Sequence, residues 1–278
     1  MKTDLNEDFL GRIVAQLDNG VIPWHKPWVV NSSGILSRST GKPYSLRNRL
    51  LLDYAGEYAT IHQINKLGGR VKKGEHGSVV YFAKTVDKKD ENGEVVDSFR
   101  VLRAWTVFRT EQCENVPNKY EALWKCGGLP SDDDSIRSMV EKYMEANGIK
   151  AVWGGAQAFF SPSDKMVQVP GHESFSSREL YWKTLFHELV HSTGEALGRK
   201  CGNTFGSSDY AHEELVADIG ACLLLGKVGL TPTEAETETV AYCQNWSKKI
   251  KSLKGDITKI LNEAQKACDF IFTNNTKE

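Results

Sequence analysis

The sequence predicts an α+β protein of two domains, in which an N-terminal α+β module is followed by a mainly helical domain. The N-terminal half combines helical periodicity with β-rich, alternating stretches, and helical periodicity dominates the C-terminal half. A cluster of chain breakers separates the two halves. Since 278 residues suffice for two ordinary domains, we place them at residues 1–125 and 131–278.

Two helices are expected early in the chain. An apolar residue at every fourth position predicts a helix over residues 5–18, which Gly20 and Pro23 end. Leucines and tyrosines on a shared face predict a second helix over residues 47–58. These helices supply the α part of the N-terminal module.

Two strands are expected to complete this module. Residues 78–84 and 100–109 alternate in polarity and are rich in β-branched and aromatic side chains, as strands are. The acidic, glycine-containing stretch between them, residues 87–97, is typical of a solvated hairpin loop.

The domain boundary is expected between Asn118 and Ser135, where Gly127, Gly128 and Pro130 precede an acidic helix start. A helix is then expected over residues 135–147. Two short strands are expected next, over residues 152–160 and 165–169.

Helices are expected to build the rest of the C-terminal domain. Ser176 and Glu179 form a capping-box pattern ahead of an apolar run that Gly194 ends. A further helix is expected over residues 210–225, and helical segments are expected from Thr233 to the C-terminus.

Composition excludes several protein classes. No run of about 18 apolar residues exists, so no transmembrane helix is expected. The N-terminus lacks an apolar stretch of signal-peptide length, and none of the six cysteines forms a Cys-x-x-Cys pair. We therefore expect a cytoplasmic protein whose cysteines are reduced and act as small buried hydrophobes.

The chain holds the motif His187-Glu188-Leu189-Val190-His191 on an expected helix. Residues four apart on a helix share one face, with Cβ atoms about 5–6 Å apart, so both histidines can reach one metal ion. Glu188 can approach a water on that ion and act as general base, as in other H-E-x-x-H enzymes. Two partly buried helix histidines without a metal are the competing interpretation.

Two histidines do not hold zinc alone, so a third ligand is required. The best candidate is Glu214, four residues before Asp218 on the next expected helix; one can ligate while the other orients a ligating histidine. Glu213 is the second choice, because it points about 100° away around that helix. His212 could be a rival ligand or a donor to the transition state, but the interpretation that we favour is a half-exposed helix residue.

The charge distribution is uneven. Residues 20–84 hold ten basic and three acidic residues, whereas the whole chain has a net charge of −1. Aromatic residues interleave with these cations, a combination that suits single-stranded nucleic acid, because cations follow the phosphates and rings stack on bases. The competing interpretation is that most of the rings are core residues. The nucleic-acid-binding candidates are Trp24, Lys26, Trp28, Lys42, Tyr44, Arg47, Arg49, Arg70, Lys72 and Lys73.

Over nearly its full length the chain resembles the ArdC-type antirestriction proteins of plasmids and phages. The residues that carry the resemblance come in a fixed order along both halves of the chain. They include Gly20-Val21-Ile22-Pro23-Trp24, Gly41-Lys42-Pro43-Tyr44, Gly68-Gly69-Arg70-Val71-Lys72-Lys73, Thr184-Leu185-Phe186-His187-Glu188-Leu189-Val190-His191 and Glu213-Glu214-Leu215-Val216-Ala217-Asp218.

The resemblance implies a domain that binds single-stranded DNA, followed by a zincin-like metallopeptidase domain. It implies protection of incoming plasmid or phage DNA from host restriction, with the metal at His187, His191 and Glu214 and with Glu188 as base. The metal is zinc or, as the alternative, manganese, and a host protein is the expected substrate. The chain departs from the family at Ser192, where an aromatic residue is frequent, and at Asp218, where Glu is frequent.

Two other functions remain open at this point. The chain could shield DNA without turnover, with a structural metal, since a zincin fold does not by itself establish proteolysis. It could also be a metalloprotease whose N-terminal domain binds protein.

Overall fold

A four-stranded sheet organises the N-terminal half. The computed structural model describes residues 4–31, 33–90, 93–125, 131–199, 207–232, 240–252 and 257–273. The sheet has the order β1-β2-β5-β4, with β1 parallel to β2 and the other pairs antiparallel. The strands are β1 (Ile35–Ser37), β2 (Gly56–Thr60), β4 (Ser78–Lys89) and β5 (Val95–Arg109).

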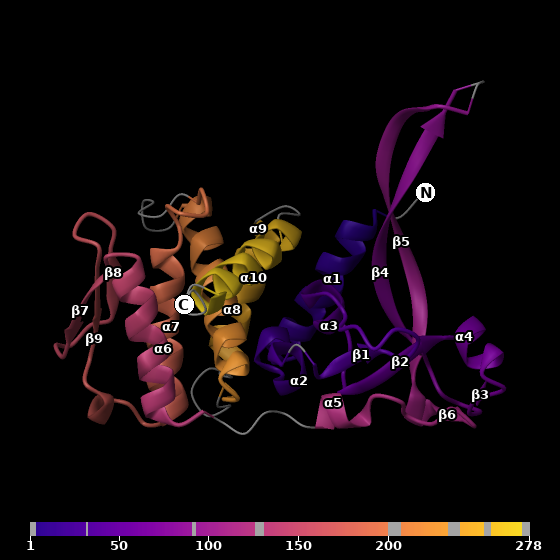
Figure 1. Cartoon of the computed structure of the whole chain (residues 1–278), viewed down its shortest axis with the longest axis horizontal. Coiled ribbons are helices and arrows are strands. Elements are labelled where there is room, and N and C mark those ends of the chain that lie inside the picture. Colours follow the sequence, from indigo (N-terminus) through magenta and orange to yellow (C-terminus); the bar gives the residue numbers. More distant parts are fainter. Residues whose placement is uncertain are drawn as a thin grey trace.

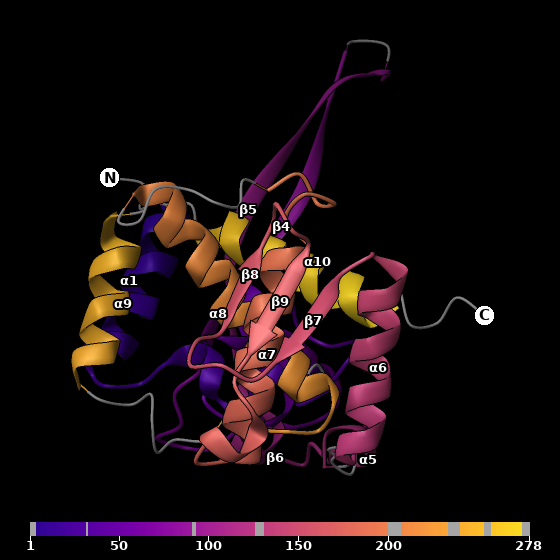
Figure 2. The same ribbon diagram turned by 90° about the vertical axis from the view of Figure 1, so that its left-hand side faces the viewer.

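Strands β4 and β5 extend far beyond the sheet as a two-stranded arm. They remain paired from Ser78 opposite Val107 to Lys89 opposite Val95, and Figures 1 and 2 show the arm projecting from the body. The two predicted strands are confirmed. The predicted loop over residues 87–97 is wrong for most of its length, because Asp87 and Lys88 pair with Ser98 and Asp97.

The helix predicted over residues 47–58 is wrong. A short helix, α3 (Leu46–Arg49), is followed by β2, which pairs with both β1 and β5. Gly56 begins β2 at φ 138°, a backbone conformation that only glycine adopts readily. Strand pairing on both edges therefore overrides the local helical periodicity.

Small elements flank the sheet. Strands β3 and β6 pair with each other, and α4 carries a capping box made by Thr60 and Gln63. These elements are α4 (Ile61–Lys66), β3 (Arg70–Val71), β6 (Cys113–Glu114) and α5 (Glu121–Lys125).

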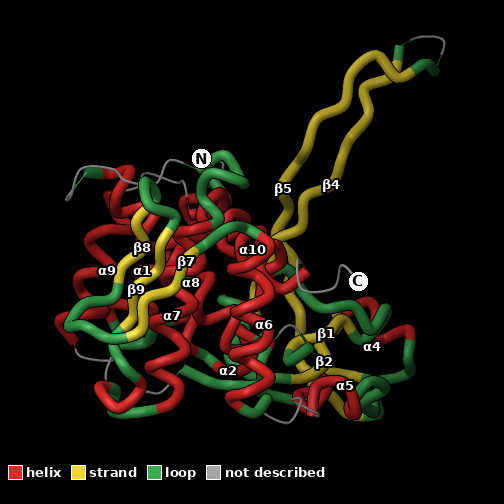
Figure 3. Tube along the Cα trace, turned by 60° about the vertical axis from the view of Figure 1, so that its left-hand side comes forward, coloured by secondary structure: helices red, strands yellow, loops and turns green. Residues whose placement is uncertain are grey.

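The C-terminal half consists of five helices and a small sheet of order β7-β9-β8, among the residues that the structure describes. Figure 3 shows this sheet lying against α7, apart from the arm. The helices are α6 (Asp133–Ala146), α7 (Arg178–Ser192), α8 (Ser208–Lys227), α9 (Val240–Ser252) and α10 (Ile257–Thr273). The strands are β7 (Lys150–Trp153), β8 (Phe159–Ser161) and β9 (Met166–Val169).

The predicted helices of this half are confirmed, and two details differ. The stretch 152–160 is two strands rather than one, because Gly154 and Gly155 turn the chain at φ 117° and 81°. The cap of α7 is Ser177 rather than Ser176, since its side chain accepts a hydrogen bond from the Leu180 N–H. Residues 233–239 lie outside the described residues.

The hydrophobic core crosses the predicted domain boundary. The chain starts with α1 (Leu5–Asp18), a 3-10 turn at Pro23–His25 and α2 (Pro27–Val30). Buried residues of these segments, such as Phe9, join one core cluster with buried residues of α7, α8, α9 and α10. The division at residues 125 and 131 stays a prediction, but the first 30 residues pack with the C-terminal helices (Figure 1).

No helix in the described ranges is long and apolar enough to cross a membrane. Four cysteines, Cys113, Cys222, Cys243 and Cys268, are buried, as expected for small apolar residues. Cys126 and Cys201 lie outside the described residues.

This shared core generates a stability prediction. Ile13 of α1 is fully buried, so Ile13→Ala should lower the free energy of unfolding by about 2–5 kcal/mol in urea, through lost transfer energy and a cavity. Ile61→Ala is the control, because Ile61 is 49% exposed and such changes cost less than about 0.5 kcal/mol. An equally small effect at Ile13 would mean that α1 does not share the core.

Candidate metal centre

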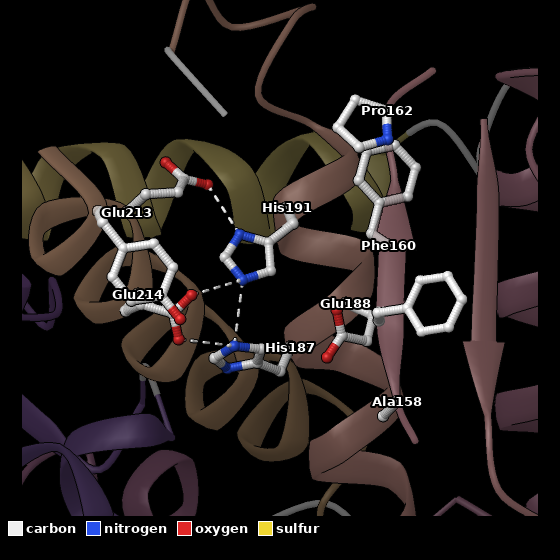
Figure 4. Close-up of a pocket in the computed structure, with 10 residues that line it drawn as sticks. Ala158, Phe160, Pro162, His187, Glu188, His191, Glu213 and Glu214 are labelled. Carbon is white, nitrogen blue, oxygen red and sulfur yellow. Dashed lines mark hydrogen bonds and ion pairs between the residues drawn. The ribbon is translucent and has the colours of Figure 1, made fainter. Parts of the chain in front are cut away.

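Helix α7 presents His187 and His191 on the face turned toward α8. Its other face is held by buried apolar side chains such as Leu185 and Phe186. One helical turn apart, the two imidazoles bring their Nε2 atoms to 3.1 Å from each other (Figure 4). Helical periodicity thus gives the convergence that the motif spacing predicts.

Glu214 on α8 completes a group of three donors. One of its carboxylate oxygens lies 3.6 Å from His187 Nε2, and the other lies 3.6 Å from His191 Nε2. A tetrahedral zinc ion with bonds of about 2.0–2.1 Å separates its ligand atoms by about 3.3–3.4 Å. The observed separations are close to this value, and one ligand atom from each of the three residues lies within 4.8 Å of the others, so the group is compatible with a divalent metal.

Glu213 holds the opposite side of the His191 ring. Its carboxylate lies 3.1 Å from His191 Nδ1 and also accepts hydrogen bonds from the buried Arg199 at 3.0 and 3.1 Å. When Nδ1 donates to Glu213, Nε2 is left unprotonated and faces Glu214 and His187. The two adjacent glutamates thus have different positions: Glu214 faces the proposed metal position, and Glu213 orients the ring of His191.

The charge of Glu213 is secured by its partners. Burial alone would raise the pKa of this carboxyl, but the hydrogen bonds from His191 and Arg199 and the charge of Arg199 lower the pKa to about 2. Arg199 is fixed in turn by Thr193 Oγ1 and the Val190 carbonyl at 2.9 and 2.7 Å. His191 therefore meets a permanent carboxylate acceptor.

The predicted role of Asp218, orienting a ligating histidine, stays a prediction, and its negative charge acts to raise the pKa of His187. Asp218 also accepts a hydrogen bond from Trp24 Nε1 at 2.8 Å and forms an ion pair with Lys183 at 3.0 Å. Its position one turn after Glu214 places it in the interface between α7, α8 and the N-terminal segment. It therefore joins the first 30 residues to the helices of the metal centre.

His25, Asp218 and Cys222 form a second group whose potential ligand atoms converge. Lys183 Nζ lies 3.3 Å from His25 Nε2 and 3.0 Å from Asp218, so an ammonium already supplies positive charge there. Burial of Cys222 raises the pKa of its thiol to about 12, which disfavours the thiolate that a metal needs. We interpret this group as a structural ion pair.

Glu188 lines a cavity of 320 Å³ together with His187, His191 and Glu214. Burial raises the pKa of its carboxyl above the ordinary value, against the opposing effect of the two histidines. Figure 4 shows its carboxylate between the histidines and strand β8, on the open side of the donor group. The carboxylate is therefore placed to exchange a proton with a molecule in this cavity.

A second cavity of 760 Å³ adjoins the first and shares Phe160, Pro162 and His191 with it. Ser192 forms part of its wall, and the Ser192 hydroxyl lies 2.9 Å from the Tyr143 hydroxyl. The family that the sequence resembles often has an aromatic residue at position 192. The smaller serine of this chain thus leaves room beside the metal centre.

Sequence reasoning missed several lining residues, among them Tyr210 and Phe160. Tyr210 and Phe160 both border the first cavity. Phe160 lies on a strand, and no local sequence pattern predicts how that strand pairs. Tyr210 lies one helical turn before Glu214, and this spacing could have identified it. His212, the rival ligand, lies 2.6 Å from Glu263 of α10 and takes no part in the donor group.

The predicted nucleic-acid-binding residues do not gather on one surface. The structure argues against Trp24, Tyr44 and Arg49 as contacts, because their side chains are buried and cannot reach a ligand. Arg47 is half-buried over the rings of Phe9 and Tyr81. The side chains of these four residues are therefore buried or half-buried in the protein, as the competing interpretation of the sequence predicts.

The remaining candidates are scattered. Lys26 bonds to Gln16 and Asp53, and Trp28 donates to the Leu52 carbonyl. The other four are exposed; they are Lys42, Arg70, Lys72 and Lys73.

Comparison with known proteins gives two family matches. Residues 3–108 match the family described as the N-terminal domain of anti-restriction factor ArdC. Residues 138–266 match a family of zincin-like metallopeptidases. Both parts of the resemblance seen in the sequence are thus confirmed.

Solved structures of an antirestriction protein, ArdC from plasmid R388, are similar over the whole chain. The metal-free crystal structure has a TM-score of 0.75 at 32% identity and covers 98% of each chain. The Mn(II)-bound structure has a TM-score of 0.75 at 29% identity and covers 99% of each. The likeness therefore extends to the arrangement of both halves.

Among curated proteins, two DNA primases TraC from Escherichia coli are 28% identical to the whole chain. The chain spans 28% and 20% of their lengths. The uncharacterized protein y4eC of Sinorhizobium fredii is 28% identical over 97% of this chain and 92% of its own.

Removing the partner of His191 should weaken metal binding. Glu213→Gln should raise the Kd for Zn²⁺ or Mn²⁺ by about 10–100-fold, because the ring loses its charged acceptor. Chelator competition measures this, with Glu141→Gln as the comparison, since Glu141 is exposed on α6, away from the donor group. An unchanged Kd for Glu213→Gln would contradict the assignment of Glu213.

The buried His25 should make stability depend on pH. Burial, together with the charge of Lys183, lowers its pKa from 6.5 to about 4, so the unfolded chain binds more protons between these values. The contribution, about 3 kcal/mol, is complete above pH 6.5 and is lost as the pH falls toward 4. His25→Gln should flatten this part of the curve in urea unfolding, whereas His76→Gln, at an exposed position, should leave it unchanged.

Proposed function

We propose, from the premise that the chain belongs to the ArdC family of antirestriction proteins, that it protects incoming plasmid or phage DNA from host restriction. In this proposal the N-terminal part binds single-stranded DNA in the cytoplasm, and the metal centre hydrolyses a peptide bond of a host protein engaged with that DNA. The observation that carries the enzymatic part is the convergence of His187, His191 and Glu214 beside Glu188.

His187, His191 and Glu214 would hold the divalent ion, and we propose zinc first, with manganese as the alternative. Two imidazoles and a carboxylate suit zinc in an open catalytic site, and the related R388 protein has been crystallised with Mn(II). Such an ion polarises a carbonyl and acidifies a water when bound. Glu213 and Arg199 support the site by keeping His191 in the orientation and tautomer that ligation needs.

Glu188 serves as the proton carrier in this proposal. Its Oε atom accepts the proton of the attacking water and then delivers it to the nitrogen of the leaving amine, so the carboxylate is regenerated. Burial favours this exchange, because it brings the pKa of the carboxyl closer to neutrality. No nearby lysine or arginine lines the cavity among the described residues, so the carboxylate is not locked in an ion pair.

The cleft beside the metal centre fits an extended peptide. Strand β8 is the edge of its sheet, paired with β9 on one side. Phe160 of this strand borders both cavities. An extended chain can add to such an edge through backbone hydrogen bonds, with side chains in the adjoining 760 Å³ cavity.

The competing function is DNA shielding without turnover, in which the metal is structural. The first cavity favours turnover over this alternative, since a closed structural site leaves no space beside its ligands for a substrate. The second alternative, an N-terminal part that binds protein, differs in salt dependence, because phosphate contacts weaken steeply with salt.

Glu188→Gln separates the enzymatic from the shielding function. The variant should lose hydrolysis of a fluorescence-quenched peptide mixture, because an amide cannot accept the proton of the water. It should keep metal affinity and salt-sensitive binding of single-stranded DNA, measured by anisotropy. Glu141→Gln, at an exposed position of α6, is the matched control and should keep all three properties.

The same variant decides how protection works. If cells that carry Glu188→Gln still protect incoming DNA from restriction, hydrolysis is not the means of protection, and the shielding function holds.

A further inference from the structure

The two faces of the β4–β5 arm differ in what they contact. One face is anchored to the body: the Tyr81 hydroxyl donates to Asp8, and Asn48 bonds the Tyr81 backbone at 2.8 and 2.9 Å. Val79 and Leu102 of this face also pack against the large core cluster. The anchor fixes the direction in which the arm projects and turns its second face outward.

At its base the second face is also packed. Val80 and Val107 belong to a small core cluster with Ile35, Leu52 and Tyr58. Beyond this base the face emerges from the body, and the next two residues of this face on each strand are exposed; they are Phe82 and Lys84 on β4 and Trp105 and Arg103 on β5. Alternation along the strands thus creates a solvent-facing surface on a rigid support.

Two large aromatic rings lie on this surface. Phe82 is 45% exposed and Trp105 is 47% exposed. Trp105 is opposite Val80 and Phe82 is opposite Arg103, so the two rings are diagonal neighbours on one face. The Tyr44 ring, 5.9 Å from the Phe82 ring, supports Phe82 from the side of the body. Adjacent aromatic rings held open to solvent mark a binding surface.

Two cations lie next to these rings on the same face, toward the outer end of the arm. Arg103 lies opposite Phe82, and Lys84 follows two residues after Phe82 on the same face. Both are exposed, and no ion pair joins either of them to an acid within the part of the chain that the structure describes. Their charges are therefore available to a negatively charged ligand.

The surface also continues toward the body. Arg109 lies four residues from Trp105 on the same face of β5 and covers the ring of Tyr54 at 4.7 Å. Tyr54 is 60% exposed and stacks on Trp28. Rings and cations thus alternate from Tyr54 to Lys84.

The outer end of the arm sets a limit to this surface. Asp87, Asp90, Glu94 and Asp97 are all exposed there, together with Lys88. Because the carboxylates outnumber this lysine, the outer end attracts phosphates less than the face that carries Lys84 and Arg103.

From this arrangement we infer that single-stranded DNA binds across the face formed by Phe82, Lys84, Arg103 and Trp105, with bases stacked on the two rings and phosphates beside the two cations. The inference rests on the proposed function and locates the DNA site on the arm, where Phe82 and Lys84 belong to the basic, aromatic stretch 20–84 and Arg103 and Trp105 lie outside it. Stacking without base-specific hydrogen bonds accepts any sequence, as protection of incoming DNA requires.

Single-stranded DNA fits this face better than a protein does. Interface cores of protein partners are depleted of lysine, and the two exposed rings here are flanked by the cations Lys84 and Arg103. A duplex keeps its bases stacked inside, so it cannot offer them to Phe82 and Trp105.

The test is fluorescence anisotropy of a labelled oligo(dT) with the full chain. Phe82→Ala and Trp105→Ala should each weaken binding by roughly ten-fold, the effect of losing one stacked base. Trp153→Ala is the matched control, because Trp153 is 46% exposed on β7, in the other sheet. Trp105→Leu keeps the apolar bulk and should behave as Trp105→Ala does.

The cations are tested by salt dependence. Lys84→Gln and Arg103→Gln should each reduce the slope of log K against log salt concentration by about 0.7, the value for one phosphate contact to a single strand. Lys142→Gln, at an exposed position of α6, should leave the slope unchanged. Circular dichroism and Mn²⁺ uptake report whether each variant is folded.

The outcomes distinguish a failure of the proposed function from a failure of the proposed DNA site on the arm. If the wild-type chain fails to bind oligo(dT) at low salt, the DNA-binding part of the proposed function and this inference are both overturned. If it binds and the Phe82 and Trp105 variants bind equally well, the arm is not the site, although the proposed function stands. Unchanged DNA affinity with a changed mass in sedimentation would assign the face to a second copy of the chain.

Discussion

The close approach of α7 to α8 is the constraint on which the metal centre depends. Gly220 lies where Val190 of α7 meets α8, and a Cβ atom at this position would stand 2.8 Å from Val190 Cγ2. Without a side chain there, the helices come close enough for Glu213 and Glu214 to reach the imidazoles of the neighbouring helix. The local spacing on α7 brings the two imidazoles together, and the packing of a second helix places Glu214 and the partner of His191 beside them.

A second glycine on α8 joins the N-terminal segment to the same unit. A Cβ atom at Gly226 would lie 2.6 Å from the backbone of Val30, so α2 rests directly on α8. Two residues before Gly220, Asp218 accepts a hydrogen bond from Trp24 and pairs with Lys183 of α7. The first 30 residues thus complete the support of the metal centre, while the sheet that follows them carries the arm.

The arm and the metal centre place different demands on their residues. At the metal centre, burial strengthens the contacts of Glu213 with His191 and Arg199, because water does not compete for them. On the arm, exposure is the requirement, since Phe82 and Trp105 must remain open to a ligand while Tyr81 anchors the ribbon. The fold meets both demands by concentrating its largest core on the C-terminal helices and projecting the ribbon away from it.

The sequence by itself determined the elements whose cause is local. Apolar periodicity predicted α1, α6, α7 and α8, and the spacing of His187, Glu188 and His191 predicted their convergence, because a helix repeats within a few residues. Tertiary structure alone decided the rest. Strand pairing turned residues 56–60 into β2, and the rotation of α8 against α7 assigned separate tasks to Glu213, Glu214 and Asp218. Which rings face solvent is likewise a property of packing: composition cannot distinguish the buried Trp24 from the exposed Trp105, because burial depends on contacts between segments far apart in the chain.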